Sequence, residues 1–224
     1  MKEFKDNFDK LTRTHRPHTV FTDFCEATAI ALSNVTHMTQ SEEWKKREER
    51  YLAIAKKYGE EDMNILSDMF ALLTKQFDED FKNGEIQDRL GILYSKMRLT
   101  NDKNGQVFTP THVCELMAEV SFDKETVDNA IKTKGFTEVY EPCCGGGALV
   151  LGFVKTMLKK GYNPQKQLLI RAGDIDLNSV YMCYIQLSLL GIPAVISHRD
   201  EILVEVYSTW YTIGCYLNKF GGVL

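Results

Sequence analysis

The first hundred residues carry apolar side chains at spacings of three and four, which is the period of an amphipathic helix. Three stretches follow this spacing: Phe21, Phe24, Thr28 and Ala31; Tyr51, Ile54 and Tyr58; and Leu66, Phe70, Leu73 and Phe77. Ser41, which precedes two glutamates, is typical of a helix N-cap, whereas Gly59 and Gly84 are typical of helix ends. The pattern therefore predicts a helical region over residues 1–100.

The pattern changes at residues 101–105, a polar Asn-Asp-Lys-Asn-Gly stretch that favours a turn and that we take as a boundary. Beyond it, short β-prone runs alternate with helical spacing. Strands are expected at 137–140, 167–171 and 194–197, and helices at 149–158 and 178–190. This alternation predicts an α/β fold with a doubly wound parallel sheet in residues 101–224.

The composition is that of a folded globular protein, with 44% hydrophobic and 26% charged residues. Apolar stretches fall far short of the roughly 20 residues that a membrane-spanning helix needs. The N-terminus is charged and mixed in sign, so it does not resemble a signal peptide, and we expect a cytoplasmic protein without membrane contact. The six cysteines form no Cys-x-x-Cys pair and the five histidines no ligand cluster, so reduced thiols and no metal are expected.

The formal net charge of −4 is spread evenly along the chain. Residues 1–100 hold 16 Lys and Arg against 18 Asp and Glu, and the remainder holds 11 against 13. We interpret the charge run at 42–50 as the solvated face of one helix. Since proteins that hold duplex DNA unaided usually present a basic face, this balance argues against autonomous DNA binding.

The strongest candidate site is the Glu-Pro-Cys-Cys-Gly-Gly-Gly-Ala segment at 141–148, between an expected strand and an expected helix. Glycines allow a tight turn and close approach to a ligand, and the helix start offers unpaired N–H groups. A loop of this kind binds a nucleotide-like cofactor, although a tight turn without a ligand has the same residues. Because Val150 stands where the dinucleotide fingerprint has its third glycine, the loop departs from that pattern.

Two acids follow the next two strands. Asp174 ends the second strand, where such folds place an acceptor for ribose hydroxyls, although an acid there often caps the next helix, as Asp176 or Asn178 would. Asp200 follows the third strand and is a candidate acceptor for an exocyclic amine, or simply a polar loop residue. All three elements are expected along one edge of the sheet, in the crevice where these sheets bind ligands.

Together, these motifs resemble the N6-adenine DNA methylases related to type I restriction modification subunits, in the short form of phages and mobile elements. The resemblance rests on Gly-Gln-Val-Phe-Thr-Pro at 105–110, the glycine loop and Gly-Asp-Ile-Asp at 173–176, and covers roughly residues 85–205. It implies a Rossmann-like methyltransferase sheet, S-adenosylmethionine as cofactor, and DNA as substrate. The segment 86–94 is similar to the helix that precedes this domain in the short members.

The resemblance also implies roles for individual residues. The Phe-Thr-Pro segment would close over the methionine part of the cofactor, and the glycine loop would hold its amino-acid end. Asp174 would hold the ribose, Asp200 would accept from the adenine amine, and Ile175 would pack on the ring. The implied cofactor-binding residues are Phe108, Thr109, Pro110, Glu141, Pro142, Cys143, Gly145, Gly147, Asp174, Ile175 and Asp200.

The catalytic residues are not assigned. These enzymes present the target adenine with an Asn or Asp-Pro-Pro-aromatic tetrapeptide, and this sequence has no Pro-Pro; Asn163-Pro164 lacks the second proline and the aromatic residue. Only 24 residues follow Asp200, so we expect a truncated sheet that lacks its later strands. An unpaired strand favours cover by another chain, a second copy or the N-terminal helices, and the aromatic residues at 207–216 are interpreted as packing.

Three functions remain open. The first is an adenine-specific DNA methyltransferase, acting on DNA with help from another chain or a homo-oligomer. The second is an inactive paralogue or partner subunit that binds S-adenosylmethionine and regulates a restriction-modification or phage system. The third is a nicotinamide-dependent oxidoreductase, which the missing glycine disfavours.

Overall fold

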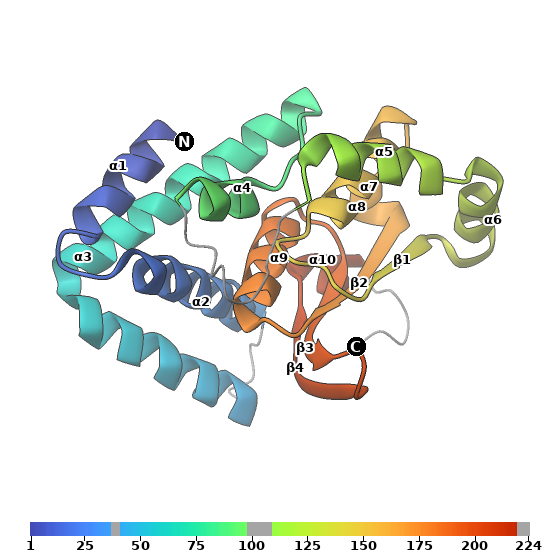
Figure 1. Cartoon of the computed structure of the whole chain (residues 1–224). Coiled ribbons are helices and arrows are strands. Elements are labelled where there is room, and N and C mark those ends of the chain that lie inside the picture. Colours follow the sequence, from blue (N-terminus) through green and yellow to red (C-terminus); the bar gives the residue numbers. More distant parts are fainter. Residues whose placement is uncertain (37–40, 98–108, 219–224) are drawn as a thin grey trace.

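The structure is a computed structural model, and it describes residues 1–36, 41–97 and 109–218. A helical N-terminal region lies beside a four-stranded sheet (Figure 1). The helical region comprises α1 (Lys2–Leu11), α2 (Pro17–Thr36), α3 (Glu42–Asn83) and α4 (Arg89–Lys96). Among the described residues, no helix combines the length and apolarity needed to cross a membrane.

Helix α3 confirms the predicted cap and breaks. The Ser41 hydroxyl accepts a hydrogen bond from the Trp44 N–H (3.2 Å), which is N-cap geometry. Gly59 has φ of 72° and ψ of 178°, so the helix bends sharply there, and the two arms diverge in Figure 1. Gly84 ends the helix in the left-handed conformation.

The second region begins with α5 (Thr111–Ser121) and α6 (Lys124–Lys134) and continues with β1 (Thr137–Glu141). Then come α7 (Ala148–Lys159), the short α8 (Pro164–Gln167), β2 (Leu168–Asp174), α9 (Leu177–Leu189) and β3 (Ala194–Asp200). All three predicted strands and both predicted helices are present. The expected boundary at 101–105 lies outside the described residues, and the division into two domains stays a prediction.

The sheet has the order β1-β2-β3-β4, with the first three strands parallel. Strand β4 (Glu205–Tyr211), which was not predicted from the sequence, pairs antiparallel with β3 and is followed by α10 (Ile213–Asn218). Because sheet residues alternate between faces, Ile170 and Ile196 point to the main core with α7 and α9. Leu169 and Val195 point to the opposite face, where Cys215 of α10 covers them.

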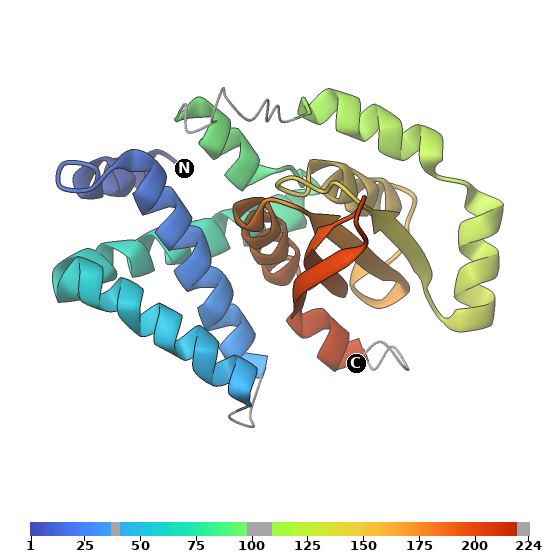
Figure 2. The same ribbon diagram turned by 60° about the horizontal axis from the view of Figure 1, so that its bottom comes forward.

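Helix α9 lies between the sheet and the N-terminal helices (Figure 2). It packs on α2, α3 and α4, and all but its ends is buried. One hydrophobic core therefore runs from the first helices to the sheet. The N-terminal region provides part of the cover that the sequence analysis expected.

The prediction that the charged run at 42–50 is a solvated helix face is wrong for Arg47. Arg47 is not on a solvated face: it is 7% exposed, and its guanidinium carbon lies 3.8 Å from the Trp210 ring centroid. Arg47 also donates to the backbone oxygen of Thr209 in β4 (3.0 Å). Trp210 itself is buried against Tyr181 and Tyr184, so packing is confirmed for this aromatic residue.

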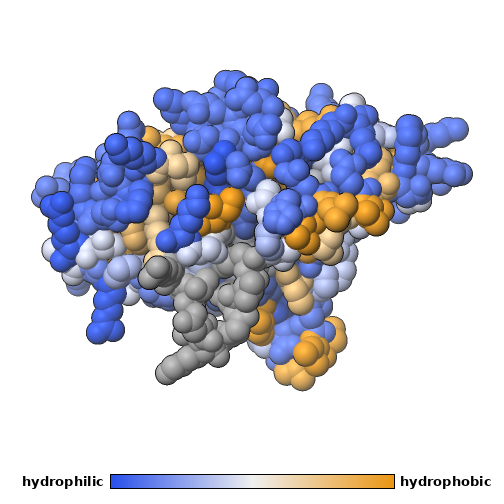
Figure 3. Space-filling model, turned by 45° about the horizontal axis from the view of Figure 1, so that its top comes forward, coloured by the Kyte–Doolittle hydropathy of each residue, from blue (hydrophilic) through white to orange (hydrophobic). Residues whose placement is uncertain are grey.

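Exposed apolar side chains gather in two places on the described surface. One is α5, with Leu116, Met117 and Val120, and the other is the β3–β4 hairpin, with Ile202, Leu203, Val204 and Val206. The face drawn in Figure 3 is mostly hydrophilic, with separate hydrophobic patches.

Candidate cofactor site

The carboxyl ends of the parallel strands meet at one edge of the sheet. In the β1–β2 register Glu141 pairs with Ala172, and in the β2–β3 register Asp174 pairs with His198. Asp174 and the start of the glycine loop therefore lie at neighbouring strand ends. Asp200 is two positions beyond His198, farther out than the other two acids.

The loop at 142–147 folds back across the end of β2. The Cys143 N–H donates to the Glu141 carboxylate (3.1 Å), and the Cys144 N–H donates to the backbone oxygen of Gly173 (2.8 Å). The loop ends at Gly147, which caps α7 with φ of 101°, a conformation that glycine adopts readily. Hydrogen bonds within the protein thus fix the conformation of the loop without a contribution from a ligand.

Asp174 organises both the loop and the following turn. Its Oδ2 accepts from the Gly145 N–H (2.8 Å) and its Oδ1 from the Asp176 N–H (2.9 Å). Burial raises the pKa of the Asp174 carboxyl above its ordinary value, and those N–H donors act in the opposite direction. Each carboxylate oxygen has two lone pairs, so Asp174 retains capacity for a ligand hydroxyl.

Asp176, and not Asp174, caps the next helix. Its carboxylate accepts from the Asn178 and Ser179 N–H groups at the start of α9. The sequence left open whether Asp174 or a later residue caps the next helix. The structure gives the capping role to Asp176.

Ile175 stands exposed directly after β2, with 58% of its surface accessible. Its backbone oxygen is 3.1 Å from His198 Nε2, and the His198 ring lies 4.9 Å from that of Tyr207. An exposed aliphatic side chain at this edge is a suitable platform for a flat ring. Neither His198 nor Tyr207 was predicted as a site residue, because their contact arises from the pairing of β3 with β4, which was not predicted.

Asp200 and Glu201 form the turn after β3. Asp200 Oδ1 accepts from the Ile202 and Leu203 N–H groups (2.8 and 2.9 Å), which gives it a turn-stabilising role. Glu201 Oε1 accepts from the Tyr140 hydroxyl at 2.7 Å and lies 2.9 Å from Arg199 Nε. This polar cluster was not predicted from the sequence, and the amine-accepting role of Asp200 stays a prediction.

The Phe-Thr-Pro segment is described only in part, because Phe108 lies outside the described residues. Thr109 and Pro110 are exposed at the start of α5, where Pro110 is the N-cap residue. Helix α5 packs on α7, the helix that the glycine loop precedes. The packing of α5 on α7 thereby connects the Phe-Thr-Pro segment to the glycine loop.

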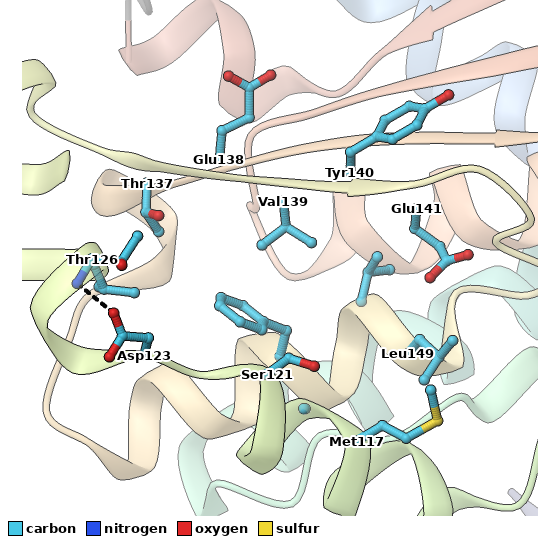
Figure 4. Close-up of a pocket in the computed structure, with 14 residues that line it drawn as sticks. Met117, Ser121, Asp123, Thr126, Thr137, Glu138, Val139, Tyr140, Glu141 and Leu149 are labelled. Carbon is cyan, nitrogen blue, oxygen red and sulfur yellow. Dashed lines mark hydrogen bonds between the residues drawn. The ribbon is translucent and has the colours of Figure 1, made fainter.

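A pocket of about 300 Å³ lies along β1 between α5, α6 and α7. Val139 and Glu141 point toward it, whereas Glu138 and Tyr140 point to the other side of the strand (Figure 4). Of the predicted cofactor residues that the structure describes, only Glu141 lines this pocket. The pocket therefore borders the candidate site and extends away from it along the edge of β1.

One other sequence feature lies apart from this edge. Asn163 and Pro164 begin α8, directly before β2, so they lie at the opposite edge of the sheet. In the parts of the chain that the structure describes, no three His, Cys, Asp or Glu side chains come together as a metal site.

A glycine loop, a carboxylate at the end of the second strand and parallel strands that end together are features of an α/β protein, and the shared strand ends form its candidate ligand site. The family model described as N-6 DNA Methylase matches residues 88–205, and the chain belongs to this family. This confirms the resemblance to the N6-adenine DNA methylases that the motifs indicated. No curated protein and no solved structure matches the chain.

Proposed function

We propose that this chain binds S-adenosylmethionine at the carboxyl edge of β1 to β3 and serves N6-adenine methylation of DNA. The observation that carries the proposal is the convergence of three features on one edge: the fixed glycine loop, the Asp174 carboxylate and the exposed Ile175. Membership of the DNA methylase family supports DNA as the substrate. In a Rossmann-like sheet, this edge is the binding crevice.

The residues present fit the cofactor. Glu141 and the loop around Cys143 and Gly145 would hold its charged amino-acid end, Asp174 its ribose hydroxyls, and Ile175 its ring. When bound, S-adenosylmethionine supplies an electrophilic methyl group. The protein's own contribution is orientation, because hydrogen bonds to Asp174 and Gly173 fix the loop in advance.

Transfer of a labelled methyl group tests this function. The chain is incubated with labelled S-adenosylmethionine and adenine-containing DNA, alone and with candidate partner chains, and digested DNA is analysed for N6-methyladenine. Label in N6-methyladenine is expected. Label that never reaches DNA would contradict the proposal.

A second candidate function is a cofactor-binding subunit that does not transfer methyl groups itself. One observation favours it: the single Asn-Pro pair of the sequence lies at the edge opposite the candidate site. Cofactor binding without methyl transfer in any combination of chains would support this candidate instead.

Changing Ile175 to alanine is expected to weaken S-adenosylmethionine binding about tenfold with little effect on folding. The side chain is 58% exposed, so it contributes little to the core. A cofactor ring packed on it would gain roughly 1–1.5 kcal/mol of binding free energy from the apolar contact. Calorimetry and urea unfolding measure the two effects. The equally exposed Val206→Ala is the control, and equal affinities for the two variants would argue against the platform.

A further inference from the structure

A buried amide connects the glycine loop to the N-terminal region. Gln186 of α9 is fully buried, and its Nε2 donates to the backbone oxygen of Gly146 (2.6 Å) and to Asp88 Oδ1 (2.8 Å). Its Oε1 accepts from the Leu90 N–H (3.1 Å). One side chain therefore holds the loop and the first turn of α4 together.

Asp88 is the other half of this connection. It is the N-cap of α4, is 5% exposed and accepts from the Gly91 N–H (2.7 Å) through the same oxygen that faces Gln186. Burial raises the pKa of the Asp88 carboxyl, and the bonds from Gln186 and Gly91 act in the opposite direction. Burying a carboxyl group costs free energy unless hydrogen bonds compensate for the lost water. The geometry around Asp88 therefore depends on the hydrogen bonds that it accepts.

Two glycines press on this carboxyl group. A methyl group at Gly91 would lie 2.0 Å from Asp88 Oδ2, and one at Gly146 would lie 2.9 Å from it. Position 146, the middle glycine of the loop, therefore has no room for a side chain, because Asp88 lies against it. From the sequence, all three glycines were attributed to a tight turn and close approach to a ligand, and for Gly146 the structure adds a different reason.

We infer that Asp88 and Gln186 are positioning residues, which set the conformation of the glycine loop and through it the affinity for the amino-acid end of the cofactor. Asp174 fixes Gly145 on one side and α7 begins after Gly147 on the other. Within the described residues, Gln186 is the one side chain that hydrogen-bonds Gly146 between them. The effect on affinity rests on the proposed function, whereas the effect on the loop does not.

Hydrogen exchange of the loop amides tests the inference without any ligand. The full chain is compared with Gln186→Leu, which keeps the volume and removes both donors, and with Ser188→Ala, a change on the same buried helix. We expect exchange in residues 143–147 to accelerate about tenfold in Gln186→Leu and to stay unchanged in Ser188→Ala. Equal loop exchange in the two variants would overturn the inference.

A second pair of variants separates positioning from bulk stability. Asp88→Asn keeps an oxygen for Gly91 and Gln186, so loop exchange close to that of the parent is expected, whereas Asp88→Ala removes the acceptor and should accelerate it. If Gln186→Leu does not fold, this pair alone decides. Loop exchange that is equally fast in Asp88→Asn and Asp88→Ala would contradict the hydrogen-bond mechanism.

Calorimetry with S-adenosylmethionine and with methylthioadenosine, which lacks the amino-acid end, completes the test. Gln186→Leu is expected to lose about tenfold in affinity for the first and little for the second. Unchanged affinity for both in a variant with a loosened loop would overturn the link to binding. No binding by the parent protein, together with faster loop exchange in the variant, would refute the proposed function and leave the positioning of the loop intact.

Discussion

Asp174→Ala is expected to lower the affinity for S-adenosylmethionine about 100-fold. The change removes the acceptor for the Gly145 and Asp176 N–H groups, so the loop loses its hold on the end of β2. It also removes the proposed ribose acceptor. Two lost hydrogen bonds from the ribose hydroxyls, at about 1.5 kcal/mol each, correspond to a factor of roughly 100 in the dissociation constant, which calorimetry measures.

Two variants control this prediction. Asp174→Asn keeps one carbonyl oxygen and should lose about tenfold. Glu138→Gln, on β1 but on the other side of the strand from the pocket, should bind as the parent does. A folded Asp174→Ala protein with the parent's affinity would mean that the cofactor site is not at this edge.

Arg47→Ala is expected to reduce the free energy of unfolding by about 3 kcal/mol. The buried guanidinium stacks on Trp210 and bonds Ser33, Glu43 and the Thr209 backbone oxygen, so α2, α3 and β4 all lose a partner. Urea unfolding followed by circular dichroism measures the loss.

Arg50→Ala is the matched control, one helical turn away. Its side chain is 60% exposed and pairs with Glu26, so less than about 1 kcal/mol is expected. Equal losses for the two variants would show that Arg47 does not join the helical region to the sheet.

Local patterns predicted most of the regular structure. Helix α7 follows from apolar residues at helical spacing and strand β2 from a short β-prone run, whereas Ser41 and Gly59 act on the backbone conformation of their own neighbourhood. Such signals depend on residues close in sequence, which is why they can be read without a structure.

The rest depended on contacts between distant residues. Arg47 looks like part of a solvated charge run, and only the arrival of Trp210 from β4 buries it. Strand β4 was missed because its Glu-Val-Tyr-Ser-Thr-Trp-Tyr sequence was interpreted only as aromatic cover. Long-range pairing decides such elements, and local propensity does not.

The candidate site was predicted in the same uneven way. The strand-end positions of Glu141 and Asp174 follow from the strand–loop–helix pattern, and Asp176 takes the expected capping role. The hold of Gln186 on Gly146 spans 40 positions, and nothing in the helical pattern of α9 distinguishes that glutamine from a surface residue.

Titration of the parent protein with S-adenosylmethionine in a calorimeter tests the central claim most directly, with NAD as the comparison ligand. We expect saturable binding of one S-adenosylmethionine per chain, competition by S-adenosylhomocysteine and no heat with NAD. Absence of saturable binding, or binding of NAD in its place, would contradict it.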